Sequence, residues 1–157
     1  MFSKSEMFFL DLEQTIIRAW DQPDLINLDK IRKFLTANKA DEVRIFSFAI
    51  WDDKDKNKFN TEMKPRIEEA LCLPVMSWPS CQDMMRADFQ HTGIRFEKGH
   101  EISEFIQLRG KKDAFIHFVC NEYRFNRAVL IDDVVPDLTL SHRTQGWAIE
   151  LWNVDNL

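Results

Sequence analysis

Short apolar runs alternate along the chain with longer segments in which apolar residues recur at every third or fourth position. The runs have the length of buried β-strands, and the longer segments have the period of helices with one buried face. This alternation is typical of βαβ units and predicts an α/β protein with a mainly parallel sheet. The expected strands are Met7–Leu10, Val43–Ile50, Val75–Trp78, Arg127–Ile131 and Gly146–Trp152. The expected helices are Asp24–Asn38, Asn60–Leu71, Ser80–Phe89 and Lys111–Asn121.

Three stretches give a weaker pattern. Asp52–Lys58 is entirely polar, which predicts a solvated loop. Ser103–Leu108 fits a strand as well as a helix, and His91–Glu101 has no clear period. The chain contains no internal repeat and no change of composition, so residues 1–157 are expected to form a single domain.

Composition and charge narrow the functional classes. The chain has 26 acidic and 21 basic residues, a net charge of −5, which disfavours a protein that coats nucleic acid non-specifically. The apolar runs are too short to cross a bilayer, the first residues lack the pattern of a signal peptide, and the three cysteines form no CxxC pair. These features predict a cytoplasmic protein with free thiols and no membrane partner.

Acidic residues directly follow two of the expected strands. Asp11 and Glu13 come after the first strand, and Asp132 and Asp133 come after the strand near the C-terminus. Because the carboxyl ends of parallel strands form the ligand crevice of an open sheet, these side chains are expected to converge there. Adjacent carboxylates repel one another unless a cation lies among them, and oxygen ligands favour Mg²⁺. The alternative is that each acidic residue caps a turn, which explains one such strand end better than two.

Two further motifs accompany these acidic strand ends. The first strand continues as DLEQT, with Thr15 four residues after Asp11, and Ser47 lies in the second apolar run, VRIFSF. Later in the chain, RGKKDAF places Lys111 and Lys112 at the start of a helix, and the last acidic segment is VLIDDVVPD, which also contains Asp137.

In this order the four motifs resemble those of the haloacid dehalogenase-like superfamily, most of whose members are Mg²⁺-dependent phosphohydrolases. The resemblance covers nearly the whole chain. It implies a Rossmann-like, three-layer α/β/α sandwich with sheet order 5-4-1-2-3, which places the first and fourth strands side by side. The 31 residues between Thr15 and Ser47 leave room for a small cap or none.

The resemblance also assigns a role to each acidic residue. Asp11 would be the nucleophile, forming an aspartyl-phosphate that water hydrolyses. Mg²⁺ would bind Asp11, the backbone carbonyl of Glu13 and Asp133, and Asp132 or Asp137 would hold a metal-bound water.

The remaining motif residues would contact the phosphoryl group. Ser47 would donate a hydrogen bond to it, and a lysine would pair with both this group and Asp11. Of the two adjacent lysines, Lys112 is preferred over Lys111. Taken alone, Ser47 is equally well explained as a small buried hydroxyl, and the two lysines as a solvated start of a helix.

Glu13 departs from the family pattern, which has a second Asp at this position as the general acid and base. A glutamate keeps the carboxyl group but moves it by about 1 Å, a displacement that can lower a rate on the order of 10²-fold. The favoured function is therefore a Mg²⁺-dependent phosphatase with a phosphorylated substrate, which a minimal cap would allow to be a macromolecule. One alternative is a catalytically weak relative that acts as a binding or regulatory module. Another is a phosphatase that processes nucleic-acid ends, for which Lys54, Lys56 and Lys58 would supply cations.

Overall fold

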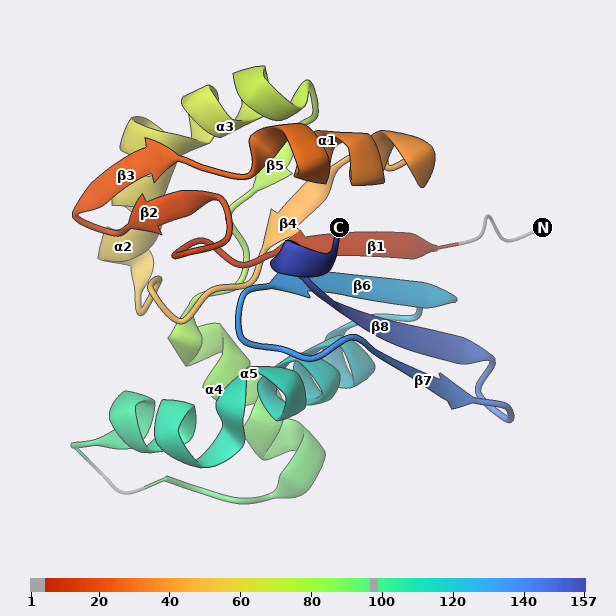
Figure 1. Ribbon diagram of the computed structural model, residues 1–157. Helices are drawn as coiled ribbons and strands as arrows, with labels where there is room; N and C mark the ends of the chain where they lie inside the picture. The colour runs from red at the N-terminus through yellow and green to blue at the C-terminus, as the bar shows by residue number, and fades with distance from the viewer. Residues whose placement is uncertain (1–4, 97–98) are drawn as a thin grey trace.

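A computed structural model describes residues 5–96 and 99–157, and its largest feature is a six-stranded sheet of order β5-β4-β1-β6-β8-β7 (Figure 1). Its strands are β1 (Glu6–Leu10), β4 (Val43–Ile45), β5 (Val75–Met76), β6 (Arg127–Asp132), β7 (Leu138–His142) and β8 (Trp147–Asn153). All neighbouring pairs are parallel except β7 and β8. When the five parallel strands are numbered along the chain, the order from β8 to β5 is 5-4-1-2-3, which confirms the expected topology.

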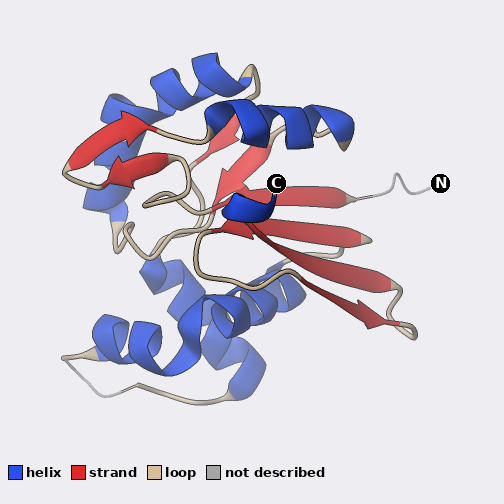
Figure 2. Ribbon diagram, in the orientation of Figure 1, coloured by secondary structure: helices blue, strands red, loops and turns tan. Residues whose placement is uncertain are grey.

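Helices flank this sheet on both sides, as Figures 1 and 2 show. On one side lie α1 (Leu28–Ala37) and α3 (Lys64–Leu71), and on the other lie α4 (Cys81–Thr92) and α5 (Glu101–Glu122). The remaining helical segments are α2 (Asp53–Lys58), a π-helical turn at Phe59–Met63 and a 3₁₀ turn at Val154–Asn156. None of the helices in the described part of the chain has both the length and the apolar character needed to cross a bilayer.

Strands β1 and β6 are apolar from their second residue to Leu10 and Ile131, because both faces of these stretches are buried. In β1, Phe8 and Leu10 pack into the core beneath α1 and α3, whereas Phe9 packs into the core beneath α4 and α5. Successive side chains of a strand point to opposite faces, so a strand covered by helices on both sides needs an unbroken apolar run. This requirement explains why the sequence alone located β1 and β6.

Helix α1 begins later than its apolar spacing predicts. The expected helix Asp24–Asn38 starts only at Leu28, because Gln22–Leu25 forms strand β3 and pairs with β2 (Ile17–Ala19) as a separate antiparallel hairpin. Asn27, in a left-handed conformation with φ 58°, then turns the chain into the helix. The two strands of the hairpin have only three and four residues, so the sequence pattern did not reveal them.

The polar stretch Asp52–Lys58 is not a loop, and that expectation was wrong. Asp52 caps helix α2 by accepting the backbone N–H of Asp55 at 3.1 Å. Acidic residues then occupy the first turn and Lys56 and Lys58 the last, an arrangement that complements the helix dipole. A short helix without buried residues leaves no apolar period in the sequence, and only its capping pattern marks it.

The two halves of α5 are separated by a break at Gly110, whose φ of 69° and ψ of 169° are not helical. Ser103–Leu108 lies in the first half, so this ambiguous segment is helical. The second half matches the expected helix Lys111–Asn121. Part of the unpatterned stretch His91–Glu101, residues 97 and 98, lies outside the described residues.

Candidate active site

The chain turns sharply after β1, and this turn holds Asp11 in place. The carbonyl of Leu12 accepts backbone N–H groups from Thr15, Ile16 and Ile17, and Gln14 adopts a left-handed conformation with φ 62°. The Thr15 hydroxyl donates to Asp11 Oδ2 at 3.1 Å. Thr15 therefore braces the carboxylate, and its role in the turn is structural.

Strand register brings the second acidic motif beside the first. In the parallel pair β1–β6, Leu10 lies opposite Ile131, and the backbone N–H of Asp11 donates to the Ile131 carbonyl at 3.0 Å. Asp11, Asp132 and Asp133 each offer a carboxylate oxygen, and these atoms all lie within 4.8 Å of one another. The convergence expected from the two strand ends is therefore present at the carboxyl edge of the central strands.

Lys111 lies among these carboxylates. Its Nζ atom is 2.8 Å from Asp11 Oδ1 and 3.2 Å from Asp132 Oδ2, and it donates to the Phe46 carbonyl at 3.4 Å. The side chain of Lys111 is only 7% exposed. The ammonium group thus neutralises part of a buried negative cluster.

The structure places Lys111 in this cluster and leaves Lys112 exposed, which corrects the preference for Lys112. The physical reason is helical periodicity. Lys111 precedes the buried residues Ala114, Phe115 and Phe118 by three, four and seven positions, so it shares their inward face. Extending the apolar stripe back to the first residue of the helix would have identified it from the sequence.

The cluster carries an excess of negative charge. With all three carboxylates ionised, Asp11, Asp132 and Asp133 contribute three negative charges against the single positive charge of Lys111. Burial raises the pKa of Asp132, with a contribution from Asp11 that the Lys111 ammonium opposes. Burial, together with repulsion from Asp11 and Asp132, raises the pKa of Asp133 to about 6. Burial alone would lower the pKa of Lys111, but Asp11 and Asp132 raise it above its ordinary value.

This arrangement fits a divalent cation. Two positive charges would cancel the excess, and three carboxylates supply the oxygen ligands that hard cations prefer. Asp132 Oδ2 is buried and touches Lys111 only as an ion pair, so it has no hydrogen-bond donor among the described residues. Because Lys111 is shared with Asp11, this ion pair satisfies the buried oxygen only in part, and a metal ion could complete its set of partners.

Ser47 and Glu13 lie near the same edge of the sheet but are held by their own contacts. Ser47 follows the shortened strand β4 and is 1% exposed, and its Oγ atom accepts the Ala49 backbone N–H at 3.1 Å. As an acceptor in that bond, the hydroxyl keeps its proton for donation. Glu13 Oε2 accepts the backbone N–H of Trp20 at 2.8 Å, which ties the carboxylate to the β2–β3 hairpin.

Of the two residues expected as alternatives to hold a metal-bound water, Asp132 lies in the cluster and Asp137 lies outside it. Asp137 is exposed, and its two carboxylate oxygens accept the Asn153 backbone N–H at 2.7 Å and the Asn156 side-chain amide at 3.0 Å. The intervening residues Val134–Pro136 carry it away from the strand end, toward the C-terminal segment. Asp137 thus stabilises the end of β8 instead of the acidic cluster.

Two of the three lysines of α2, Lys56 and Lys58, have partners of their own. Lys56 Nζ lies 2.8 Å from Asp83 Oδ2 and 4.2 Å from the centre of the Trp78 ring. Lys58 Nζ lies 5.0 Å from the centre of the Trp20 ring. These contacts join α2 to α4 and to the hairpin, and they leave the nucleic-acid alternative without added support.

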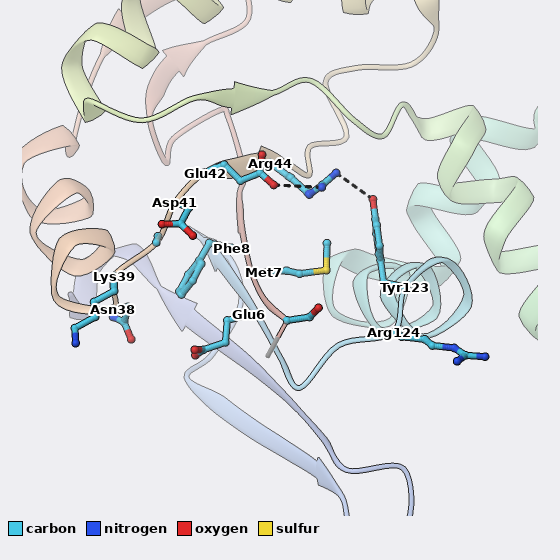
Figure 3. Close-up of a pocket in the computed structure, with 12 residues that line it drawn as sticks. Glu6, Met7, Phe8, Asn38, Lys39, Asp41, Glu42, Arg44, Tyr123 and Arg124 are labelled. Carbon is cyan, nitrogen blue, oxygen red and sulfur yellow. Dashed lines mark hydrogen bonds and ion pairs between the residues drawn. The ribbon is translucent and has the colours of Figure 1, made fainter. Parts of the chain in front are cut away.

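A cavity of about 440 Å³ opens at the opposite edge of the sheet, beside the amino ends of β1 and β4. Figure 3 shows Arg44 between Glu42 and Tyr123, to which it makes hydrogen bonds of 3.4 Å each. The lining mixes acidic and basic side chains and includes none of the motif residues. The amino edge of a parallel sheet is also not where ligands of such folds bind.

Comparison with known proteins gives no matching family model, no matching curated protein and no matching solved structure. The functional assignment therefore rests on the geometry of the carboxyl edge. Asp11, Asp132 and Asp133, with Lys111 among them, form a largely buried charged group that could hold a metal ion.

Proposed function

We propose that this chain is a Mg²⁺-dependent phosphatase of the haloacid dehalogenase-like type, acting through an aspartyl-phosphate on Asp11. The observation that carries the proposal is the Lys111 ammonium, 2.8 Å from Asp11 and 3.2 Å from Asp132, beside a third carboxylate that completes a metal-binding set. Phosphoryl transfer depends mainly on positioning and on neutralising the phosphate oxygens. A nucleophilic carboxylate flanked by an ammonium and two metal-binding carboxylates meets both needs.

Asp11, Asp132 and Asp133 would hold the cation. When bound, Mg²⁺ neutralises these carboxylates and the phosphate oxygens, which otherwise repel one another. Lys111 would pair with the transferring phosphoryl group, and the Ser47 hydroxyl would donate a hydrogen bond to it. Thr15 would keep the Asp11 carboxylate oriented through the hydrogen bond to Oδ2.

The reaction would proceed in two displacements at phosphorus. An Asp11 oxygen forms a bond to phosphorus as the ester bond breaks, and the departing oxygen takes a proton from the Glu13 carboxyl. Water then attacks phosphorus and gives a proton to the Glu13 carboxylate. The bond between Asp11 and phosphorus breaks, which releases inorganic phosphate and restores both side chains.

The site would accept a large substrate. The segment between β1 and β4 contains the β2–β3 hairpin and α1, with no separate cap in it. A site without a cap admits a phosphoryl group that projects from a macromolecule. Small phosphate esters would enter as well, so a chromogenic ester is a suitable first probe.

Phosphate release from p-nitrophenyl phosphate, with Mg²⁺ and with EDTA, tests the proposal. We expect turnover that requires the metal. Absence of turnover with this ester and with phosphorylated peptides, sugars and oligonucleotides would contradict the proposal. That result would favour a binding or regulatory module, for which the hydrogen bond from Trp20 to Glu13 is the supporting observation, because it engages the acid–base carboxylate elsewhere.

Glu13→Gln should separate the two chemical steps. Glutamine keeps an oxygen that can accept the Trp20 N–H, so the hairpin contact survives while proton transfer is lost. We expect steady-state turnover to fall about 10²-fold or more. Because p-nitrophenolate leaves without a proton, stopped-flow traces should show a burst of about one equivalent before the slow phase. Full activity in this variant would remove Glu13 from the mechanism.

Metal binding should weaken in acid. The pKa of Asp133, ordinarily 3.8, is raised to about 6 in the metal-free protein, so its ionised form is disfavoured until the pH exceeds 6. Its contribution to folding stability without metal is present below about pH 4 and is lost as the pH rises through 6. A cation requires the ionised form, so the increase in Tm produced by Mg²⁺ should be largest above pH 7 and small at pH 5.

Thermal unfolding at several pH values, with and without Mg²⁺, measures this effect. Asp133→Asn should abolish the metal-induced increase in Tm. Asp137→Asn is the matched control and should retain it, because Asp137 bonds to Asn153 and Asn156 and lies outside the acidic cluster. An equal loss in both variants would contradict the assignment of the metal site.

A further inference from the structure

A second buried charge cluster lies between α4 and α5, away from the acidic edge. Asp88 of α4 is fully buried and accepts two hydrogen bonds from Arg109, from Nε to Oδ1 at 2.7 Å and from Nη2 to Oδ2 at 3.1 Å. His117 Nδ1 also lies 2.7 Å from Asp88 Oδ1. The Asp88 carboxylate thus contacts two side chains of α5, Arg109 and His117.

The positions of these two partners along α5 are informative. Arg109 is the last residue before the break at Gly110, and His117 lies two turns into the second half of the helix. Asp88 therefore contacts both halves of α5 across the break. Because α4 is a continuous helix that begins with a capping box at Ser80 and Asp83, it provides a rigid base for this contact.

The break itself needs an external constraint. Gly110 has a φ of 69° with a ψ of 169°, a region that residues other than glycine seldom adopt. Backbone hydrogen bonds of a regular helix do not hold the two halves at a set angle through such a residue. The angle between the two halves must be set by side-chain contacts. Asp88 makes such contacts with Arg109 in the first half and with His117 in the second.

Lys111 is the residue that this angle positions. It is the first residue after Gly110 and reaches Asp11 Oδ1 at 2.8 Å and Asp132 Oδ2 at 3.2 Å. A small rotation of the second half of α5, to which Lys111 belongs, would move the ammonium away from both carboxylates. Misplacement of a catalytic group by about 1 Å can lower a rate on the order of 10²-fold.

We propose that Asp88, by holding Arg109 and His117 on either side of Gly110, is a positioning residue that sets the location of Lys111 in the active site. The effect on turnover rests on the proposed phosphatase function, whereas the effect on the location of Lys111 does not. A buried carboxylate is seldom the most stabilising way to pack two helices, since apolar residues of similar volume often serve as well or better. Arg109 and His117 favour the ionised carboxylate here, and despite burial the pKa of Asp88 is lowered.

Asp88→Asn tests the proposal, because it keeps the volume of the side chain and removes the charge that holds Arg109. The first readout is the side-chain ammonium resonance of Lys111 in ¹⁵N-labelled protein, identified by its absence in Lys111→Met. Burial and ion pairing slow its proton exchange. We expect the resonance to shift or broaden beyond detection in Asp88→Asn. The second readout is turnover of p-nitrophenyl phosphate, for which kcat should fall about 10- to 100-fold with KM changed less than about twofold.

Glu150→Gln is the matched control. Glu150 also receives a bidentate pair from an arginine, Arg127, but this pair joins β8 to β6 near the amino end of the strands. Both substitutions should lower Tm, and only Asp88→Asn should move the Lys111 resonance. If Asp88→Asn does not fold, Arg109→Gln removes the same contact from the other side and should give the same two results.

Two outcomes would overturn the positioning role. One is a folded Asp88→Asn protein with an unchanged Lys111 resonance and unchanged kcat. The other is an equal displacement of the resonance in Glu150→Gln, which would indicate general loosening of the fold. Should the unmodified protein show no turnover, the phosphatase proposal fails and the resonance alone decides the role of Asp88.

Discussion

Replacing Asp11 with asparagine should eliminate turnover while leaving the protein folded. The amide oxygen is too weak a nucleophile to form the bond to phosphorus, so we expect a loss of about 10⁴-fold or more. The side chain keeps its volume and can still accept the Thr15 hydroxyl, which lies 3.1 Å from Oδ2 of the carboxylate. Removing one negative charge also relieves repulsion with Asp132 and Asp133, so stability without metal should not fall greatly.

Phosphate release with Mg²⁺ and thermal unfolding without it measure the two effects of Asp11→Asn. Asp137→Asn provides the control for a lost carboxylate in the same region, since Asp137 is exposed and lies outside the cluster. Turnover that persists in Asp11→Asn at more than a few per cent would exclude Asp11 as the nucleophile. The metal-dependent activity would then need a different acceptor of the phosphoryl group.

Lys111→Met should lower both stability and activity, and Mg²⁺ should restore only the stability. Methionine fills most of the space of the lysine but leaves Asp11 and Asp132 buried without a positive partner. Breaking a buried ion pair from one side typically lowers the free energy of unfolding by about 3–5 kcal/mol. A bound cation would replace the missing charge, whereas the phosphoryl group would still lack its ammonium partner, for a loss of about 10²-fold in kcat.

Urea unfolding of Lys111→Met in EDTA and in Mg²⁺, together with steady-state kinetics, tests this expectation. Lys112→Met is the natural control because Lys112 is exposed, and a surface substitution of this kind changes stability by no more than about 0.5 kcal/mol. Similar losses in the two variants would mean that the contacts of Lys111 with Asp11 and Asp132 contribute nothing measurable. A larger loss in Lys112→Met would reverse the assignment of the motif lysine.

Much of the fold could be predicted from the chain because its central strands are buried on both faces. An unbroken apolar run followed at once by acidic residues marks β1 and β6, and both strands occur where this pattern predicts them. The expected strand Val43–Ile50 is shorter, since β4 ends at Ile45 and the apolar residues beyond it pack from a loop. Strand β7, at the edge of the sheet, was not predicted, because its alternation of apolar and polar residues, LTLS, is only four residues long.

The sequence predicted the carboxylates of the acidic site but not every residue that joins them. Asp11, Asp132 and Asp133 follow from two strand ends and the rule that parallel strands end at one edge. The sequence favoured Lys112 over Lys111, and Asp137 was a candidate because of its spacing alone. Contacts across 100 residues, such as that of Lys111 with Asp11, depend on how helices pack on the sheet.

The sequence by itself therefore determined the α/β class, the sheet order implied by its resemblance, and the strand ends from which the carboxylates project. These features depend on local patterns, the period of apolar residues and the residue that follows a strand. Only the tertiary structure decided that Lys111 completes the cluster, that Glu13 is held by Trp20, and that Asp88 spans the break in α5. Such contacts are set by how side chains pack in three dimensions. A local pattern can show that Lys111 lies on the inward face of its helix, but it does not show which groups that face meets.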